Sequence, residues 1–206
     1  MAILVHDPEI QARLLAEREA SEGSRYDEVW DGVYVLPPLP NNEHQELASE
    51  LWLVFRNVLK ARGGGVAYNG LNVSDREEGW RQNYREPDVA VILPDNPGRD
   101  CDTHWFGGPD LVVEILSPND PARDKRPFYA AVGVRELLVV DRDPWRLELY
   151  RLDPDLVRLE PAGTSDPSSG KKLASEVLPL AFRLLPGPTR PRIEVLETGG
   201  GGSWVV

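Results

Sequence analysis

The stretch PDLVVEILSPND, residues 109–120, has the pattern of a buried β-strand with a carboxylate in its middle. Five of the six residues 111–116 are apolar, and several are β-branched, which predicts a strand over this range. Glu114 interrupts the apolar run. Because burying a carboxylate among apolar side chains is costly unless a partner compensates it, Glu114 is the first candidate for a functional residue.

The segments on either side of this strand predict a mixed sheet. Downstream, residues 125–132 are expected to form a short helix that ends at Gly133, and residues 137–140 form a second apolar strand. This β-α-β order is typical of two parallel strands joined by a crossover. Upstream, Pro87-Asp88 opens a third apolar strand, where the missing N–H of proline is tolerable.

The rest of the chain predicts helices around this sheet. Residues 42–62 show helical spacing of apolar side chains, with His44 in the first turn on or beside the buried face. We therefore expect an α/β fold, with a central mixed β-sheet flanked by helices. The expected divisions are an N-terminal helical segment (1–24), one domain (25–185) and, because of its GGGGS run, a flexible C-terminal tail (186–206).

Composition and charge limit the function. The 206 residues are 41% hydrophobic and carry a formal net charge of −11, with Cys101 as the single cysteine. No apolar run approaches the roughly 20 residues of a membrane-spanning helix, and the N-terminus shows no secretory signal, so we expect a cytoplasmic protein. An acidic chain repels phosphate on average, which argues against avid nonspecific DNA binding, whereas clustered carboxylates suit divalent cations.

Asp88 and Glu114 are the main candidates for metal-binding and catalytic residues. If their strands are neighbours, both carboxylates can project from one face, and two like charges brought close must share a proton or a cation. Mg²⁺ or Mn²⁺ held by two carboxylates, a backbone carbonyl and waters is the common solution, and such a metal activates water. Asp124 can cap the next helix and place Lys125 at its first position, where the lysine could orient the attacking water.

Three blocks of the sequence resemble the Uma2 family, formerly DUF820, which belongs to the PD-(D/E)xK nuclease superfamily. The blocks are EPDVAVI (86–92), PDLVVEILSP (109–118) and DKRPFYAAVGVRELLVVD (124–141), within a similarity that extends over roughly residues 25–185. The resemblance implies a restriction-endonuclease-like core and a metal-dependent endonuclease that hydrolyses DNA phosphodiester bonds.

The resemblance also implies roles for individual residues. Asp88 would be the aspartate of the PD motif, and Glu114 the acidic residue of the (D/E)xK motif. Ile115 would lend its backbone carbonyl to the metal. Leu116 departs from the superfamily pattern, because it stands where that pattern has lysine. Lys125, in a K-R-x-x-Y context, would supply the lysine from the following helix.

Glu28 and His44 are accessory candidates. Superfamily nucleases often add an acidic group from an N-terminal element, which Glu28 could supply, and His44 could face the cleft. Each candidate also has a purely structural explanation. Glu28 could be an ordinary strand residue, and His44 a hydrogen-bonded, half-buried histidine. Glu114 could belong to a structural ion pair with Lys or Arg, Asp88 could cap a strand start, and Lys125 could be a solvated lysine at a helix end.

Three functions remain open at this point. The first is a Mg²⁺-dependent endonuclease acting on DNA, for which a homodimer is plausible, since cutting two strands favours two sites related by a two-fold axis. The second is a catalytically inactive binding or scaffold module that keeps the nuclease core, favoured by the charge of −11 and by Leu116. The third is a metal-dependent hydrolase of a smaller phosphate ester, which fits an acidic surface better than duplex DNA does.

Overall fold

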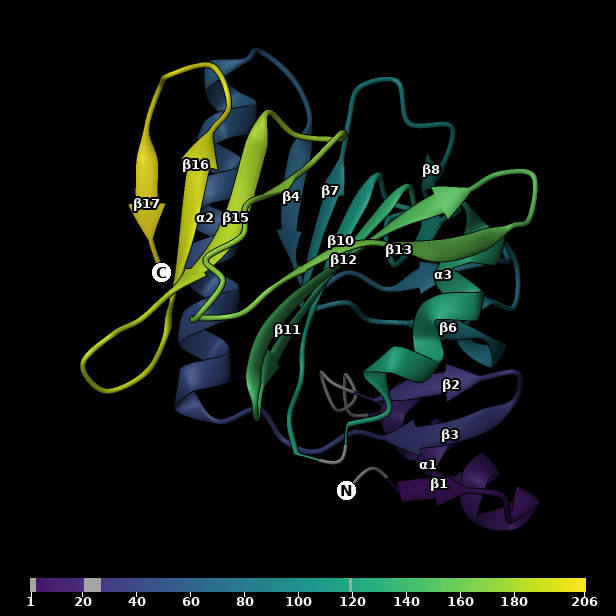
Figure 1. Cartoon of the computed structure of the whole chain (residues 1–206). Coiled ribbons are helices and arrows are strands. Elements are labelled where there is room, and N and C mark those ends of the chain that lie inside the picture. Colours follow the sequence, from purple (N-terminus) through teal and green to yellow (C-terminus); the bar gives the residue numbers. More distant parts are fainter. Residues whose placement is uncertain (1–2, 21–26, 119) are drawn as a thin grey trace.

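A six-stranded mixed sheet forms the centre of the computed structural model, which describes residues 3–20, 27–118 and 120–206 (Figure 1). In spatial order its strands are β13 (Arg158–Ser165), β12 (Trp145–Asp153), β11 (Glu136–Arg142), β10 (Leu111–Ile115), β7 (Val89–Ile92) and β4 (Val66–Asn69). β10 and β11 run parallel, and the other neighbouring pairs in this sheet are antiparallel. The predicted mixed central sheet is therefore confirmed.

The parallel pairing of β10 and β11 follows from the segment that joins them. η2 (Ala122–Lys125) and α3 (Arg126–Val132) carry the chain back to the start of β11, where Glu136 pairs with Leu111. Gly133 ends α3 with a φ of 90°, a left-handed conformation that glycine adopts without strain. β10 is buried along its whole length, which explains why its sequence is a nearly continuous apolar run rather than an alternating one.

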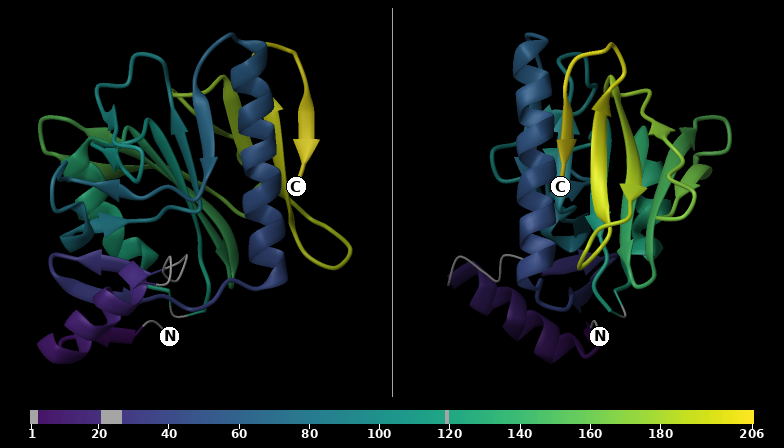
Figure 2. Two further views of the ribbon diagram at one scale, coloured as in Figure 1. Left: turned by 180° about the vertical axis from the view of Figure 1, so that it is seen from behind. Right: turned by 60° about the vertical axis from the view of Figure 1, so that its left-hand side comes forward.

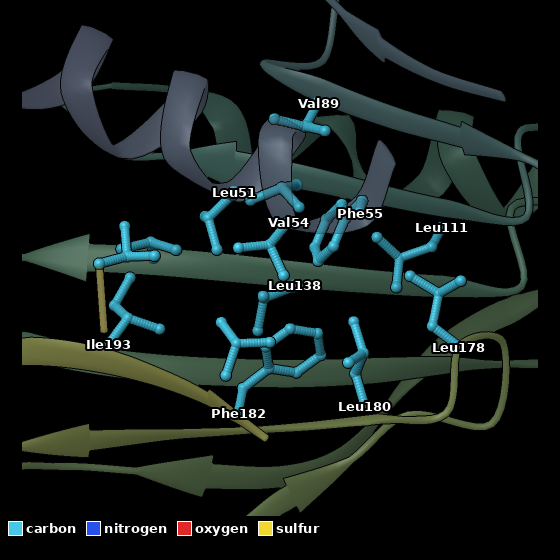
Figure 3. Packing of buried hydrophobic residues seen from close by; sticks show 14 of the residues in the cluster. Leu51, Val54, Phe55, Val89, Leu111, Leu138, Leu178, Leu180, Phe182 and Ile193 are labelled. Carbon is cyan, nitrogen blue, oxygen red and sulfur yellow. The ribbon is translucent and has the colours of Figure 1, made fainter. Parts of the chain in front are cut away.

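One face of the central sheet packs against the long helix α2 (Asn42–Ala61) and a second sheet (Figure 2). The second sheet has four strands, in spatial order β14 (Leu173–Ala174), β15 (Leu180–Leu185), β16 (Arg192–Glu197) and β17 (Ser203–Val205). Figure 3 shows the core between them, to which Leu51 and Phe55 of α2, Leu138 of β11 and Phe182 of β15 contribute. This core makes α2 a firm support for the residues in its first turn.

The opposite face of the central sheet packs against α3 and the N-terminal sheet. In spatial order the N-terminal sheet contains β1 (Ile3–Val5), β3 (Val33–Leu36), β2 (Glu28–Trp30), β6 (Tyr84–Arg85), β5 (Val73–Ser74), β9 (Trp105–Phe106) and β8 (Arg99–Asp100). Val73 of β5 shares a buried cluster with Tyr129 of α3. Val29 of β2 pairs with Tyr84 of β6, which brings β2 next to the segment that precedes Asp88.

Residues 186–206 differ from the flexible tail that their composition indicated. They contain β16 and β17, and the side chains of Ile193 and Val195 are fully buried. Two backbone hydrogen bonds of 2.9 and 2.8 Å join Ile193 to Val206. Alternation along β16 turns its apolar side chains inward, and the glycine run only connects two strands. The expected boundary at 185 therefore cuts a sheet, and the expected boundary at 24 lies outside the described residues.

Two further helices complete the fold, and the start of α3 differs from the sequence prediction. α1 (Pro8–Ala20) begins after Asp7, whose carboxylate accepts hydrogen bonds from two backbone N–H groups of the first turn. The single turn η1 (Trp80–Gln82) precedes β6. The N-cap of α3 is Lys125 and makes no side-chain capping bond, so Asp124 does not cap this helix. In the described part of the chain, no helix is long and apolar enough to span a membrane.

Candidate active site

The carboxylates of Asp88 and Glu114 come together at one end of the central sheet. The antiparallel register pairs Val113 with Val89, so Glu114 and Asp88 take the next position along the two strands. The backbone N–H of Ile115 donates a hydrogen bond of 2.7 Å to Asp88 Oδ2. The condition on which the sequence argument rested, that these two strands are neighbours, is met.

Lys125 reaches the carboxylates from η2. Its Nζ lies 3.1 Å from Glu114 Oε1, 3.0 Å from Glu114 Oε2 and 2.8 Å from Glu28 Oε1. The side chains of Lys125, Glu114 and Glu28 are 8%, 4% and 3% exposed, so the three form a buried ion-pair cluster. Glu114 is thus tolerated in an apolar strand because an ammonium group compensates it. A structural ion pair was the alternative explanation for the buried Glu114. The structure contains this ion pair, and its cation is Lys125, the lysine to which the nuclease hypothesis gives a catalytic role.

Glu28 is held in place from three sides. Its Oε2 accepts a hydrogen bond of 2.6 Å from Trp30 Nε1, and its Oε1 accepts one of 2.8 Å from the backbone N–H of Glu86. Lys125 is the third partner. Because both carboxylate oxygens already accept hydrogen bonds, Glu28 acts in this arrangement as a fixed counterion for the lysine.

His44 lies next to Asp88 at the start of α2. Asn41 caps the helix, with its side chain accepting a hydrogen bond of 2.9 Å from the backbone N–H of His44. This cap fixes the first turn, and His44 Nε2 lies 3.3 Å from Asp88 Oδ2. His44 Nδ1 is buried without a hydrogen-bond partner. His44 and the Ile115 N–H therefore hold the same oxygen of Asp88, which fixes the direction of its carboxylate.

Burial and charge set the protonation of the cluster. Burial raises the pKa of Glu114 well above its usual value; Lys125 opposes this increase, and the negative charge of Asp88 adds to it. Burial alone would lower the pKa of Lys125, but the carboxylates of Glu114 and Glu28 outweigh burial and hold that pKa above its usual value. The lysine therefore stays protonated at neutral pH, and Glu114 takes up a proton more readily than an exposed glutamate does.

The structure adds Tyr129 and Asp120 to the residues that the sequence indicated. The Tyr129 hydroxyl donates a hydrogen bond to Glu114 Oε1. Asp120 accepts backbone hydrogen bonds from Ser117 and Ala122, and burial raises its pKa while Lys125 opposes the increase. Tyr129 follows Lys125 by four residues, a spacing that puts two side chains on one face of a helix. Asp120 gave no comparable signal, because Asp in a loop next to Pro is common.

All five candidate side chains line one small cavity of about 70 Å³. These are Glu28, His44, Asp88, Glu114 and Lys125. A neighbouring hollow of about 550 Å³ shares the lining residues Ser117 and Asp120 with this cavity, and another of about 300 Å³ shares Gly70 and Glu86. The structure thus joins residues from five separate segments in one cavity, which shares lining residues with two larger hollows.

Comparison with known proteins identifies the family. The model of the Uma2 family, described as "Putative restriction endonuclease", matches residues 12–186. The chain belongs to the Uma2 family. Among solved structures, the Uma2 chain is similar to a protein from Anabaena variabilis ATCC 29413 described as "a putative nuclease belonging to DUF820". That likeness has a TM-score of 0.55 and 20% sequence identity, and covers 79% of this chain and 82% of the other. The restriction-endonuclease-like core expected from the sequence is therefore confirmed. No curated protein matches the chain.

Nuclease families of this kind generally use a divalent metal, and the carboxylates of the Uma2 site are oxygen donors of the type that such a metal binds. Within the described residues, no group of three or more His, Cys, Asp or Glu side chains is arranged to hold a metal ion. Mg²⁺ needs no such group, because it keeps several waters and binds through one or two carboxylates. Asp88, with a side chain 21% exposed, is the most open of the three carboxylates, and Glu114 is its neighbour across the strands.

Proposed function

We propose that this Uma2 protein is a Mg²⁺- or Mn²⁺-dependent endonuclease that hydrolyses phosphodiester bonds in DNA. The observation that supports this function best is the meeting of Asp88, Glu114 and Lys125 at one cavity. Asp88 precedes β7, Glu114 lies in β10, and Lys125 ends η2. Two carboxylates and a lysine from these three segments are the set that the family resemblance assigns to catalysis.

Each proposed role follows from a contact in the site. Asp88, Glu114 and the backbone carbonyl of Ile115 would hold the metal, which supplies a positive charge that activates water and stabilises a phosphoryl oxygen. His44 and the Ile115 N–H orient the Asp88 carboxylate. Lys125 is held by Glu114 and by Glu28, so its positive charge has a fixed position from which it can orient water and stabilise developing negative charge.

The central cavity is small, with a volume of about 70 Å³. In the proposed function only the scissile phosphate and the attacking water need to enter it. In the proposed function, the chain on either side of the cleaved bond lies in the two adjoining hollows.

A specific observation favours a second candidate, a metal-dependent hydrolase of a smaller phosphate ester. One adjoining hollow is lined by the carboxylates of Glu86, Asp100 and Asp102, and among the described residues its lining includes no lysine or arginine. In the other hollow the lining residues Arg123 and Arg142 pair with Asp141 and Glu43. A polyanion is repelled by the first lining, and a small ester that need not enter that hollow is repelled less. An inactive scaffold is the third candidate, since Lys125 already compensates the carboxylates in this arrangement.

Metal binding is the first test. Calorimetric titration with Mn²⁺ is expected to show binding to the wild type and a loss of affinity of at least about 100-fold in Asp88→Asn and Glu114→Gln, because each change removes a charged oxygen ligand. Asp102→Asn is the matched control. It makes the same chemical change in an adjoining hollow, and asparagine tolerates the positive φ of 68° at that position.

The candidates differ in what the protein then cleaves. The endonuclease proposal expects cleavage of plasmid DNA that requires Mn²⁺ or Mg²⁺, that is lost in Asp88→Asn and that is kept in Asp102→Asn. Cleavage of bis(p-nitrophenyl) phosphate without cleavage of DNA would instead support the smaller ester. If the wild type binds neither metal, the metal-dependent mechanism is wrong and the scaffold remains. The homodimer and the cytoplasmic location stay predictions from the sequence.

A further inference from the structure

The helical segment that carries Lys125 is only weakly stabilised by its own sequence. It is the last residue of η2 and the N-cap of α3, a helix of only seven residues without a side-chain capping bond. Pro127 lies in the first turn, so that position has no backbone N–H to donate. A short helix of this kind is marginal without packing or side-chain contacts. Some contact outside the helix must therefore fix the backbone that carries the lysine.

Arg123, two residues before Lys125, makes such a contact. Its Nη2 donates hydrogen bonds of 2.6 Å to Asp141 Oδ2 and 3.0 Å to Glu148 Oε1. Asp141 belongs to β11 and Glu148 to β12, and their side chains are only 12% and 7% exposed. One guanidinium group thus ties η2 to two strands of the central sheet. Buried carboxylates bound by arginine in this way are strong and directional partners.

Arg126 reinforces the same attachment on the other side of Lys125. Its Nε donates a hydrogen bond of 3.1 Å to the backbone carbonyl of Arg123, and its guanidinium lies 5.0 Å from the centre of the Tyr150 ring. The Tyr150 hydroxyl in turn donates a hydrogen bond of 2.7 Å to Glu148 Oε2. Arg123 therefore contacts Glu148, and Arg126 contacts Tyr150, which binds the same carboxylate.

The geometry of η2 explains why this attachment positions the lysine. In a helix with three residues per turn, side chains two positions apart point roughly 240° apart around the axis. Arg123 accordingly contacts β11 and β12, while Lys125 contacts Glu114 of β10 and Glu28 of β2. We propose that Arg123 is a positioning residue, which holds η2 on the sheet so that the Lys125 ammonium reaches the carboxylate cluster. Its importance for catalysis rests on the proposed function, whereas the position of Lys125 can be measured without turnover.

Acylation of Lys125 gives that measurement. The chain has four lysines, and Lys60, Lys171 and Lys172 are exposed, so they serve as internal references. N-hydroxysuccinimidyl acetate, followed by peptide mass spectrometry, should modify Lys125 far more slowly than these three in the wild type. In Arg123→Gln the rate at Lys125 is expected to rise about ten-fold, with the reference lysines unchanged, because η2 can now open locally.

Arg146→Gln is the matched control, because Arg146 binds the same Glu148 Oε1 at 2.6 Å but lies on β12 and leaves η2 untouched. It removes the same charge from the same carboxylate. The proposal expects Lys125 to stay protected in Arg146→Gln. If both variants raise the Lys125 rate equally, or if Arg123→Gln folds with Lys125 still protected, Arg123 does not position the lysine.

A conservative variant covers the case in which Arg123→Gln does not fold. Arg123→Lys keeps the positive charge but replaces the planar guanidinium with a point charge, so an increase of about three-fold at Lys125 is expected. An unchanged rate in Arg123→Lys would overturn the proposal in that case. If DNA cleavage is found, Arg123→Lys should also lower kcat with little change in KM, and Arg146→Gln should leave both unchanged. If the protein proves inactive, the acylation result still decides the positioning role.

Discussion

Replacing Lys125 with methionine is expected to lower the free energy of unfolding by about 3 kcal/mol, because it removes the cation that contacts two buried carboxylates directly. Glu114 and Glu28 keep side chains only 4% and 3% exposed. Without the ammonium, Glu114 must either hold a poorly compensated charge or take up a proton, and Glu28 loses its ion-pair partner. Methionine fills a similar volume, so the loss comes from charge rather than from a cavity.

Urea unfolding at neutral pH measures this effect. The matched control is Lys60→Met, which removes an exposed lysine from the last turn of α2 and should change stability by less than about 0.5 kcal/mol. A second variant tests the cause. Adding Glu28→Gln and Glu114→Gln to Lys125→Met removes the uncompensated charges and is expected to restore most of the lost stability. Wild-type stability in Lys125→Met alone would show that the lysine does not compensate the carboxylates.

The pairing of Asp88 and Glu114 was predictable because each lies at or within an apolar strand. Both strands are short and strongly apolar, so the sequence suggested that they could be neighbours; their antiparallel pairing, which places both carboxylates at one sheet end, comes from the structure. Lys125 was a candidate because it follows the Glu114 strand closely, and the family resemblance then assigned it the role of the missing lysine. The cap that was expected from Asp124 is absent, and Arg123 fixes the segment through Asp141 and Glu148 instead.

The contacts of Arg123 and of Glu28 could not be predicted from the sequence, because they join residues that lie far apart in the chain. Arg123 meets carboxylates 18 and 25 residues away, and Glu28 meets the backbone of Glu86 58 residues away. No local pattern of spacing reports such contacts, since they depend on how the N-terminal sheet and the central sheet are placed in the fold. A charged residue in a loop or a short strand looks the same in sequence whether it is solvated or buried.

The C-terminal segment was wrongly predicted to be a flexible tail, because its glycine-rich composition was given more weight than its alternating apolar residues. GGGGS is typical of a flexible linker, yet residues 192–197 alternate in the way that a half-buried strand requires. A chain that ends at Leu185 is therefore expected to lose cooperative folding, although a flexible tail could be removed without effect. The truncation would expose the apolar side chains of β15, including Phe182 and Leu184, which are fully buried in the intact chain.

A point mutation in β16 separates loss of packing from loss of chain length. Ile193→Ala is expected to lower the free energy of unfolding by about 2–5 kcal/mol, because Ile193 is fully buried in the core shared with α2 and β15. Val205→Ala is the control in β17, where the side chain is 60% exposed and the change should stay within about 0.5 kcal/mol.

Urea unfolding of the two point variants, with circular dichroism and soluble yield of the truncated chain, measures the outcome. If the truncated chain unfolds at the wild-type midpoint and Ile193→Ala matches Val205→Ala, the segment is a dispensable tail and the second sheet does not support the fold. If the expected losses are seen, α2 depends on that sheet for its packing. The position of His44 beside Asp88 then depends, through α2, on the last residues of the chain.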